Sequence, residues 1–297
     1  MRVAVALLLA GTALSCVTGP ATGGGAWVHP SGRGYAKFTL SSIAAHHFYS
    51  GSGDIVSGPD YRRLGLSFYG ELGLGRGLEF SADLDGVSRS SFGGATPSTG
   101  VGDMHFGLKK SLLSGRWPAA VSLVGTVTTS NHGDYPSAAQ LTTPGDIQVA
   151  QSRFELPTAD NVRALTASFH VSRGSADGRQ YANLSAGYHW RGVRRSDANR
   201  TERLNDEFRY QLDGGRKLGS RWWLSLALRG RHPVGGLDPA NDGGVGYGEG
   251  VRYDAFGLGA SYAMAPHWSV DAGLEGAFEA RNEVAGANLL LGISFGN

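Results

Sequence analysis

The sequence has little cysteine, little net charge and no long apolar run. Cys16 is the only cysteine among 297 residues, so the rest of the chain can form neither a disulfide nor a multi-cysteine metal site. The formal net charge of +2 argues against an electrostatic nucleic-acid binder. Beyond a short stretch at the start, no apolar run approaches the roughly 20 residues that a transmembrane helix needs.

Glycine, in contrast, is abundant. The chain has 47 glycines and 11 prolines, which leave little room for long helices. Hydrophobic residues make up 41% of the chain, a share that excludes disorder by composition. The mean hydropathy of −0.18 excludes a helical membrane protein. This composition predicts an all-β protein with many turns.

Residues 1–16 have the pattern of an export signal. Arg2 precedes an apolar run at 3–10, and small residues follow it, which is the order of a secretory signal peptide. The run is too short to cross a bilayer as a helix. We therefore expect the chain to be exported, with a glycine-rich segment at 17–34 ahead of a single domain at 35–297.

Two ways of processing this signal remain open. The stretch 13–16 resembles a lipobox, which makes Cys16 a candidate for lipidation, although Ala13 replaces the usual branched residue. The alternative is ordinary cleavage near Ala21 or Ala26. Both interpretations lead to export.

Strict alternation of apolar and polar residues dominates the rest of the chain. In residues 64–74, leucines and Phe68 occupy one set of alternate positions, while glycine, serine, tyrosine and Glu71 occupy the other. The same division recurs at 78–86, 103–112, 181–190 and 268–279. A period of two is the period of a β-strand, and a helix would not separate these residues.

The alternating segments predict a transmembrane antiparallel up-and-down β-barrel of about 12 strands. The strands are expected near 35–49, 61–74, 77–90, 101–113, 117–130, 162–173, 180–192, 206–218, 221–234, 251–265, 267–281 and 286–297. Many exceed the usual five to six residues of globular strands and suit a tilted membrane crossing. A soluble β-sandwich also alternates, but its polar face is seldom so rich in ionisable residues.

The connections between these segments alternate in length. Short ones are expected at 75–76, 114–116, 174–179, 219–220 and 265–266, and longer polar ones lie between them, with long loops near 131–161 and 235–250. Short turns at one end and long loops at the other are typical of outer-membrane barrels. The segment 146–156 is ambiguous, and we assign it to the long loop because a fourteen-strand barrel would need a second extra strand.

Tryptophans support the same topology. Trp117, Trp222 and Trp268 each open a strand directly after a short turn. We therefore expect them in an aromatic girdle at one membrane interface. Phe295 lies on the apolar face near the C-terminus, where bacterial barrels commonly carry an aromatic residue.

The stretch from residue 26 to 113 resembles a known group of proteins. It contains AWVHPSGRGYAKFTL, then a Tyr-Gly-Glu-x-Gly-Leu strand at 69–74 and a tight turn, and then GVGD at 100–103, which opens another strand. These motifs are similar to uncharacterised Gram-negative outer-membrane barrels grouped with the phenol-degradation meta-pathway outer-membrane proteins. The resemblance implies uptake of small organic molecules and supplies no site residues.

Ionisable residues concentrate on the face that the alternation predicts to line the lumen. The lumen-lining candidates are Arg63, Glu79, Asp83, Asp85, Asp103, His105, Lys109, Arg209, Arg229, Arg231, Asp271, Glu275 and Glu279. One interpretation is a narrow channel or transporter whose charges orient small polar or organic solutes. The other is a non-conducting structural or surface-binding barrel, closed by ion pairs.

The histidines and serines on the predicted lumen face do not require a metal or catalytic site. His105, His170 and His189 can all face the lumen, but lumen hydrogen bonding explains them as well as a metal does. His170 and Ser172 share a face, yet side chains two apart along a strand lie about 6 to 7 Å apart, too far for a nucleophile and its base. We therefore expect no catalytic site, metal or cofactor, and a lipid-modifying hydrolase is only a third alternative.

These inferences place the chain in the bacterial outer membrane. Its expected partners are outer-membrane lipid and lipopolysaccharide, the barrel-assembly machinery and a small solute, with no nucleic acid. The arginine-rich stretch 191–203 is expected in a solvated loop that contacts anionic lipopolysaccharide.

Overall fold

The structure is a computed structural model that describes residues 25–93, 97–129, 156, 158–195, 201–235, 246–247 and 250–297. All regular structure in these residues is β. No described helix is long and apolar enough to cross a membrane.

Twelve long strands make up the barrel. They are β1 (Gly34–Tyr49), β2 (Ile55–Gly75), β3 (Leu78–Phe92), β5 (Met104–Leu113), β6 (Ala119–Val127), β7 (Ala164–Gly174), β8 (Gln180–Arg191), β11 (Glu207–Leu218), β12 (Trp222–Pro233), β13 (Arg252–Ala265), β14 (Trp268–Arg281) and β16 (Asn288–Gly296). The predicted fold class and strand number are confirmed.

Four short strands add to this frame at one end. β4 (Ser98–Val101) pairs with β3, and β15 (Glu283–Val284) pairs with β1. β9 (Val193–Arg195) and β10 (Thr201–Arg203) form a separate hairpin. β4 and β15 extend the barrel sheet at this end, and none of the four short strands adds a further strand to its circumference.

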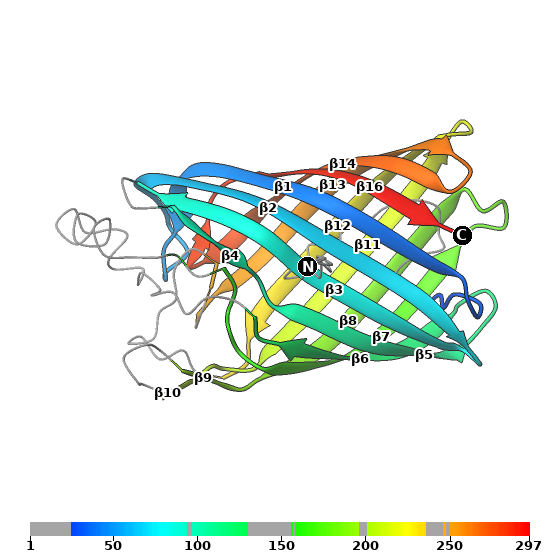
Figure 1. Cartoon of the computed structure of the whole chain (residues 1–297), viewed down its shortest axis with the longest axis horizontal. Helices are drawn as coiled ribbons and strands as arrows, with labels where there is room; N and C mark the ends of the chain where they lie inside the picture. The colour runs from blue at the N-terminus through cyan, green and yellow to red at the C-terminus, as the bar shows by residue number, and fades with distance from the viewer. Residues whose placement is uncertain are drawn as a thin grey trace, which may run out of the picture.

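Each barrel strand pairs antiparallel with its neighbours, and the sheet closes on itself. β1 pairs with β2 on one side and with β16 on the other, so the first and last long strands seal the cylinder. Closure leaves no edge strand with unpaired backbone groups, which is the condition for a sheet to cross a lipid bilayer. Figure 1 shows the strands tilted against the long axis of the barrel.

The turns at one end of the barrel are short. They cover 76–77, 114–118, 175–179, 219–221 and 266–267, close to the predicted connections. The first requires a left-handed backbone, with φ values of 87°, 53° and 70° at Gly75, Arg76 and Gly77. The C-terminus lies at the same end, on the right of Figure 1, where Asn297 N–H donates to Gly34 O at 3.1 Å. We call this the short-turn end and its opposite the long-loop end.

The outer face carries a continuous apolar belt. Each of the twelve strands exposes at least one large apolar side chain, with 36% to 59% of its surface accessible. One from each strand is Leu40, Leu72, Phe80, Leu108, Leu123, Phe169, Leu184, Leu212, Leu226, Leu258, Leu274 and Leu291. A water-soluble protein rarely exposes apolar patches of this extent, whereas a lipid-facing surface requires them.

The predicted girdle residues lie on this outer face. Trp117, Trp222 and Trp268 are 52%, 49% and 45% exposed, and all three adjoin short turns. The ring of Trp268 lies 5.1 Å from that of Phe295, centroid to centroid. These three tryptophans and Phe295 therefore lie at the short-turn end of the belt.

Candidate functional site

A cavity of about 530 Å³ lies inside the barrel. Ten of the lumen-lining candidates contribute to its wall: Arg63, Glu79, Asp83, Asp85, His105, Lys109, Arg209, Arg229, Arg231 and Glu275. They come from β2, β3, β5, β11, β12 and β14, strands whose alternate residues form the apolar belt. The alternation that predicts lipid contact for one face therefore brings these charges together on the other.

Two other candidates are buried but do not line the cavity. Asp103 is 2% exposed and accepts backbone hydrogen bonds from Thr129 and Asn161 at the long-loop end. Asp271 is 3% exposed and lies 3.7 Å from the Lys37 ammonium. Both side chains are engaged by other parts of the chain.

The prediction for Glu279 is wrong, because a β-bulge reverses the alternation. β13 pairs Asp254 with Glu279 but Ala255 with Ala277, which leaves Phe278 as an extra residue in β14. A bulge of this kind moves every following side chain to the opposite face. The Glu279 side chain is 60% exposed and pairs with Arg252 at 2.7 Å on the outer face.

A buried ion pair in the cavity wall joins β12 and β14. Arg229 Nη2 lies 2.8 Å from Glu275 Oε2, and both side chains are almost fully buried. On the neighbouring β8 and β11, the Asn183 amide donates to Asp213 Oδ2 at 2.8 Å. These contacts hold both signs of charge in fixed positions along the lumen.

We expect Glu275→Gln to shift ion selectivity in planar bilayers toward anions, because Arg229 then faces the lumen without its carboxylate. Glu279→Gln is the matched control: it removes the same charge from the same strand but on the outer face. Equal reversal potentials for the two variants would contradict the lumen position of Glu275.

Three histidines line the cavity and bind hydroxyl groups. His105 Nδ1 lies 2.9 Å from Thr126 Oγ1, His170 Nε2 2.8 Å from Ser122 Oγ, and His189 Nδ1 2.7 Å from Thr166 Oγ1. All three hydroxyl partners belong to β6 and β7. Among the described residues, these histidines do not converge on a shared metal position.

The segment at residues 25–29 folds into the barrel at the short-turn end. Ala26 N–H donates to Ser172 Oγ at 2.8 Å, and His29 N–H donates to Glu79 Oε2 at 2.8 Å. Gly25 O accepts a hydrogen bond from Lys109 Nζ at 3.3 Å. Three strands of the wall therefore hold this segment, which we call the N-terminal plug.

Charged side chains of the wall contact the N-terminal plug. Lys109 Nζ lies 2.7 Å from Glu79 and 3.3 Å from Glu71, and His29 Nδ1 lies 2.7 Å from Glu79. His29, Glu71 and Glu79 form the one trio of the described chain with metal-ligand spacing. Lys109 already supplies positive charge between the two carboxylates, so this trio does not need a metal for charge balance.

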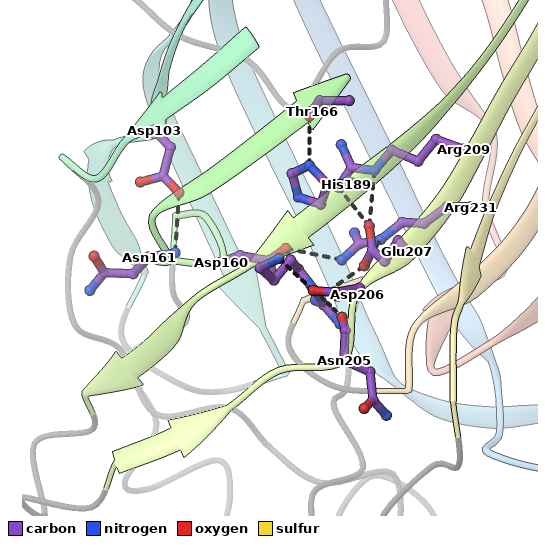
Figure 2. A network of polar contacts seen from close by, with 11 residues as sticks. Asp103, Asp160, Asn161, Thr166, His189, Asn205, Asp206, Glu207, Arg209 and Arg231 are labelled. Carbon is purple, nitrogen blue, oxygen red and sulfur yellow. Dashed lines mark hydrogen bonds and ion pairs between the residues drawn. The ribbon is translucent and has the colours of Figure 1, made fainter. Parts of the chain in front are cut away.

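A second polar cluster fills part of the lumen at the long-loop end (Figure 2). Glu207, with 0% exposure, lies within 3.1 Å of Arg191 and within 2.7 Å of both Arg209 and Arg231. Arg231 also reaches Asp160 at 3.0 Å. Three guanidinium groups thus converge on one buried carboxylate, which we call the Glu207 cluster.

Asp160 belongs to a loop segment that turns into the barrel. Asn161 donates its N–H to Asp103, as Figure 2 shows, and Thr158 Oγ1 donates to Val101 O at 2.7 Å. Asn161 adopts φ 52°, a left-handed conformation that asparagine tolerates. We call residues 158–161 the loop plug, because these contacts hold them across the interior.

An apolar cluster lies inside the barrel beside the loop plug. Its buried members are Ala45, Phe48, Tyr61, Phe92, Leu156 and Val284. The rings of Phe48 and Phe92 are 5.8 Å apart. Nearby, Arg63 lies 5.7 Å from the ring centroid of Tyr247, and burial raises the pKa of the Tyr247 phenol well above its usual value. Apolar and aromatic side chains therefore occupy one side of the lumen at this end.

No side-chain arrangement in the described residues resembles a lipid hydrolase on the outer face. The hydrogen-bonded pair of Ser122 and His170 faces the cavity instead of lipid. The Gly-x-Ser-x-Gly match at 292–296 lies inside β16, with Ser294 4% exposed, and not on the strand-to-helix turn that such a nucleophile needs.

Comparisons with known proteins give matches to solved structures. An outer-membrane channel from Pseudomonas putida F1 has a TM-score of 0.67 at 13% identity, over 91% of this chain and 97% of that chain. The NanC porin has a TM-score of 0.48 at 11% identity, over 86% of this chain and 98% of its own. No family model and no curated protein match the sequence.

The Pseudomonas structure establishes what the two chains share, which is the fold. At 13% identity the agreement lies in the path of the backbone and not in shared residues. The predicted resemblance to the meta-pathway proteins is supported at this coarser level, as a likeness to outer-membrane barrels.

Proposed function

We propose that the protein is an outer-membrane channel of a Gram-negative bacterium that passes small polar or organic solutes. The observation that carries this proposal is the internal cavity of about 530 Å³, lined by charges of both signs. Its size falls within the roughly 300 to 1,000 Å³ of small-molecule sites. The apolar belt supports a membrane location, and the fold shared with an outer-membrane channel supports the same class.

The proposed path has three sections. A solute enters at the long-loop end past the loop plug and the Glu207 cluster, crosses the cavity, and leaves past the N-terminal plug. Lys109 and Arg229 lie within 2.8 Å of the carboxylates of Glu79 and Glu275, so opposite charges are already fixed along the wall. Fixed dipoles of this kind orient a polar solute without net attraction to one charge.

Cysteine accessibility in a conducting bilayer tests this path. Ser168 lines the cavity, while the adjacent Ala167 pairs with Leu123 on the outer face. We expect a charged, water-soluble thiol reagent to reduce the conductance of Ser168→Cys and to leave Ala167→Cys and the wild type unchanged. A folded, membrane-embedded barrel with no conductance and no reaction at Ser168→Cys would contradict the channel.

The alternative is a non-conducting barrel that serves a structural or surface-binding role. The Glu207 cluster favours it, because three arginines around a fully buried carboxylate make a satisfied network across the lumen. Under this alternative the long loops bind a partner at the cell surface. The same conductance measurement separates the two functions.

Contact with lipopolysaccharide, assembly by the barrel-assembly machinery and export by the leader are part of this proposal. The fate of Cys16 lies outside the described residues. Membrane fractionation with heat-modifiable gel mobility tests the location, and mass spectrometry of the mature N-terminus tests the lipidation.

A further inference from the structure

The short-turn end of the barrel carries a rim of exposed positive charge. Its exposed cationic residues are Arg33, Arg76, Lys110, Arg116, Arg173, Arg179, Arg216 and Arg221. Within the part of this end that the structure describes, Asp177 and the C-terminal carboxylate are the exposed acidic groups. The outer face at the long-loop end differs: Arg62 and Arg252 are accompanied there by Asp60 and Glu279.

Some of these cations point to the lipid side of the wall. In β11, Arg216 follows Leu212 at the alternate positions that build the apolar belt. Lys110 follows Leu108 in β5, and Arg173 follows Phe169 in β7, in the same way. They are therefore placed where the apolar belt meets the membrane interface.

Aromatic residues of the girdle contact the cationic rim. The Arg173 guanidinium lies 4.6 Å from the ring centroid of Trp117. Arg221 donates a hydrogen bond to Tyr262 Oη at 3.1 Å, and the rings of Tyr262 and Trp222 are 4.9 Å apart. Aromatic rings of this kind sit at the level of lipid headgroups.

A groove of about 670 Å³ begins beside Arg216 on the outer face. Its small residues are Gly214, Ala260 and Ala272, and its larger ones are Leu224, Leu226 and Leu258. The strand register places Arg216 opposite Leu224, Leu224 opposite Ala260, and Ala260 opposite Ala272. The groove is mostly apolar and lies on the lipid side, with the Arg216 cation at one end.

We propose that this groove binds one anionic phospholipid of the inner leaflet, with the headgroup phosphate at Arg216 and Arg221 and an acyl chain along the small residues. Charge complementarity selects the headgroup, since the rim carries many cations and few anions. The groove selects the chain, because alanine and glycine leave a depression among leucines. The inference rests on the proposed membrane location, with the short turns on the periplasmic side.

Native mass spectrometry of the full-length protein, extracted from membranes into detergent, tests the site. The probes are phosphatidylglycerol and, for comparison, phosphatidylcholine with the same chains. We expect one phosphatidylglycerol to remain bound under conditions that remove phosphatidylcholine. Arg216→Gln should weaken its binding about fivefold, the effect of about one unit charge at an anionic membrane surface. Ala272→Leu, which fills the groove, should also weaken the binding of phosphatidylglycerol.

Matched controls lie elsewhere on the outer face. Arg62→Gln removes a cation at the opposite end, and Ala167→Leu enlarges an outer-face alanine of β7; neither should change lipid binding. Equal retention of the two lipids, or equal loss in Arg62→Gln and Arg216→Gln, would overturn the site. These outcomes are distinct from failure of the proposed function, which would appear as a protein absent from the membrane fraction or as a folded, membrane-embedded barrel that does not conduct.

Discussion

Glu207→Gln is expected to destabilise the barrel by about 3 to 5 kcal/mol, the usual cost of leaving buried charges without their partner. Glutamine preserves the shape of the side chain, so the loss comes from charge and not from packing. Arg191, Arg209 and Arg231 would face one another around a neutral amide, and the Asp160 carboxylate, 3.0 Å from Arg231 and 4.0 Å from Arg191, would compensate only part of their charge. Urea unfolding in detergent, followed by heat-modifiable mobility, measures the change.

Glu279→Gln provides the control for this measurement. Its side chain is 60% exposed and its partner Arg252 lies on the outer face, so its removal should cost about 1 kcal/mol or less. Arg209→Gln combined with Glu207→Gln should recover part of the lost stability, because it removes one uncompensated cation. Unchanged unfolding of Glu207→Gln would show that water, and not the arginines, balances this carboxylate.

The barrel itself follows from local sequence. Alternation with a period of two assigns each side chain to lipid or lumen without knowledge of the partner strand, and glycine-rich dipeptides such as 75–76 mark the turns. The predicted strands accordingly agree with the observed ones to within a few residues along most of the wall. The segment 146–156, assigned to the long third loop, lies outside the described residues except for Leu156, which is buried against Phe48 and its neighbours.

The pattern along a single strand does not predict which segments of the chain fill the lumen. The N-terminal plug depends on Ala26 and Ser172, which are 146 residues apart, and the loop plug depends on Thr158 and Val101, 57 residues apart. Composition predicts only a glycine-rich segment at 17–34, without a packed role for its residues. The sequence around Phe278 alternates regularly, so it does not predict the bulge there. The bulge becomes apparent only from the pairing of β14 with β13.

Release of the N-terminal plug is expected to raise the conductance of the barrel. Glu79→Ala removes the acceptor that binds both the N–H and the ring of His29. It also removes the closer of the two carboxylates beside Lys109, which keeps Glu71 and Gly25 O at 3.3 Å. We expect residues 25–29 to leave the lumen and the unitary conductance to rise severalfold, because the short-turn end is then lined by wall side chains only. Single-channel recording of the folded variant in planar bilayers measures this.

Ser81→Ala is the matched control, since Ser81 lines the cavity at the next inward position of β3. It should conduct like the wild type. A deletion of residues 17–29 behind the intact leader removes the plug and keeps every wall residue, so it separates plug release from a rearrangement of Lys109 after the loss of Glu79. If the deletion conducts no better than the wild type, the constriction lies at the Glu207 cluster, and Glu207→Gln rather than Glu79→Ala should then open the path.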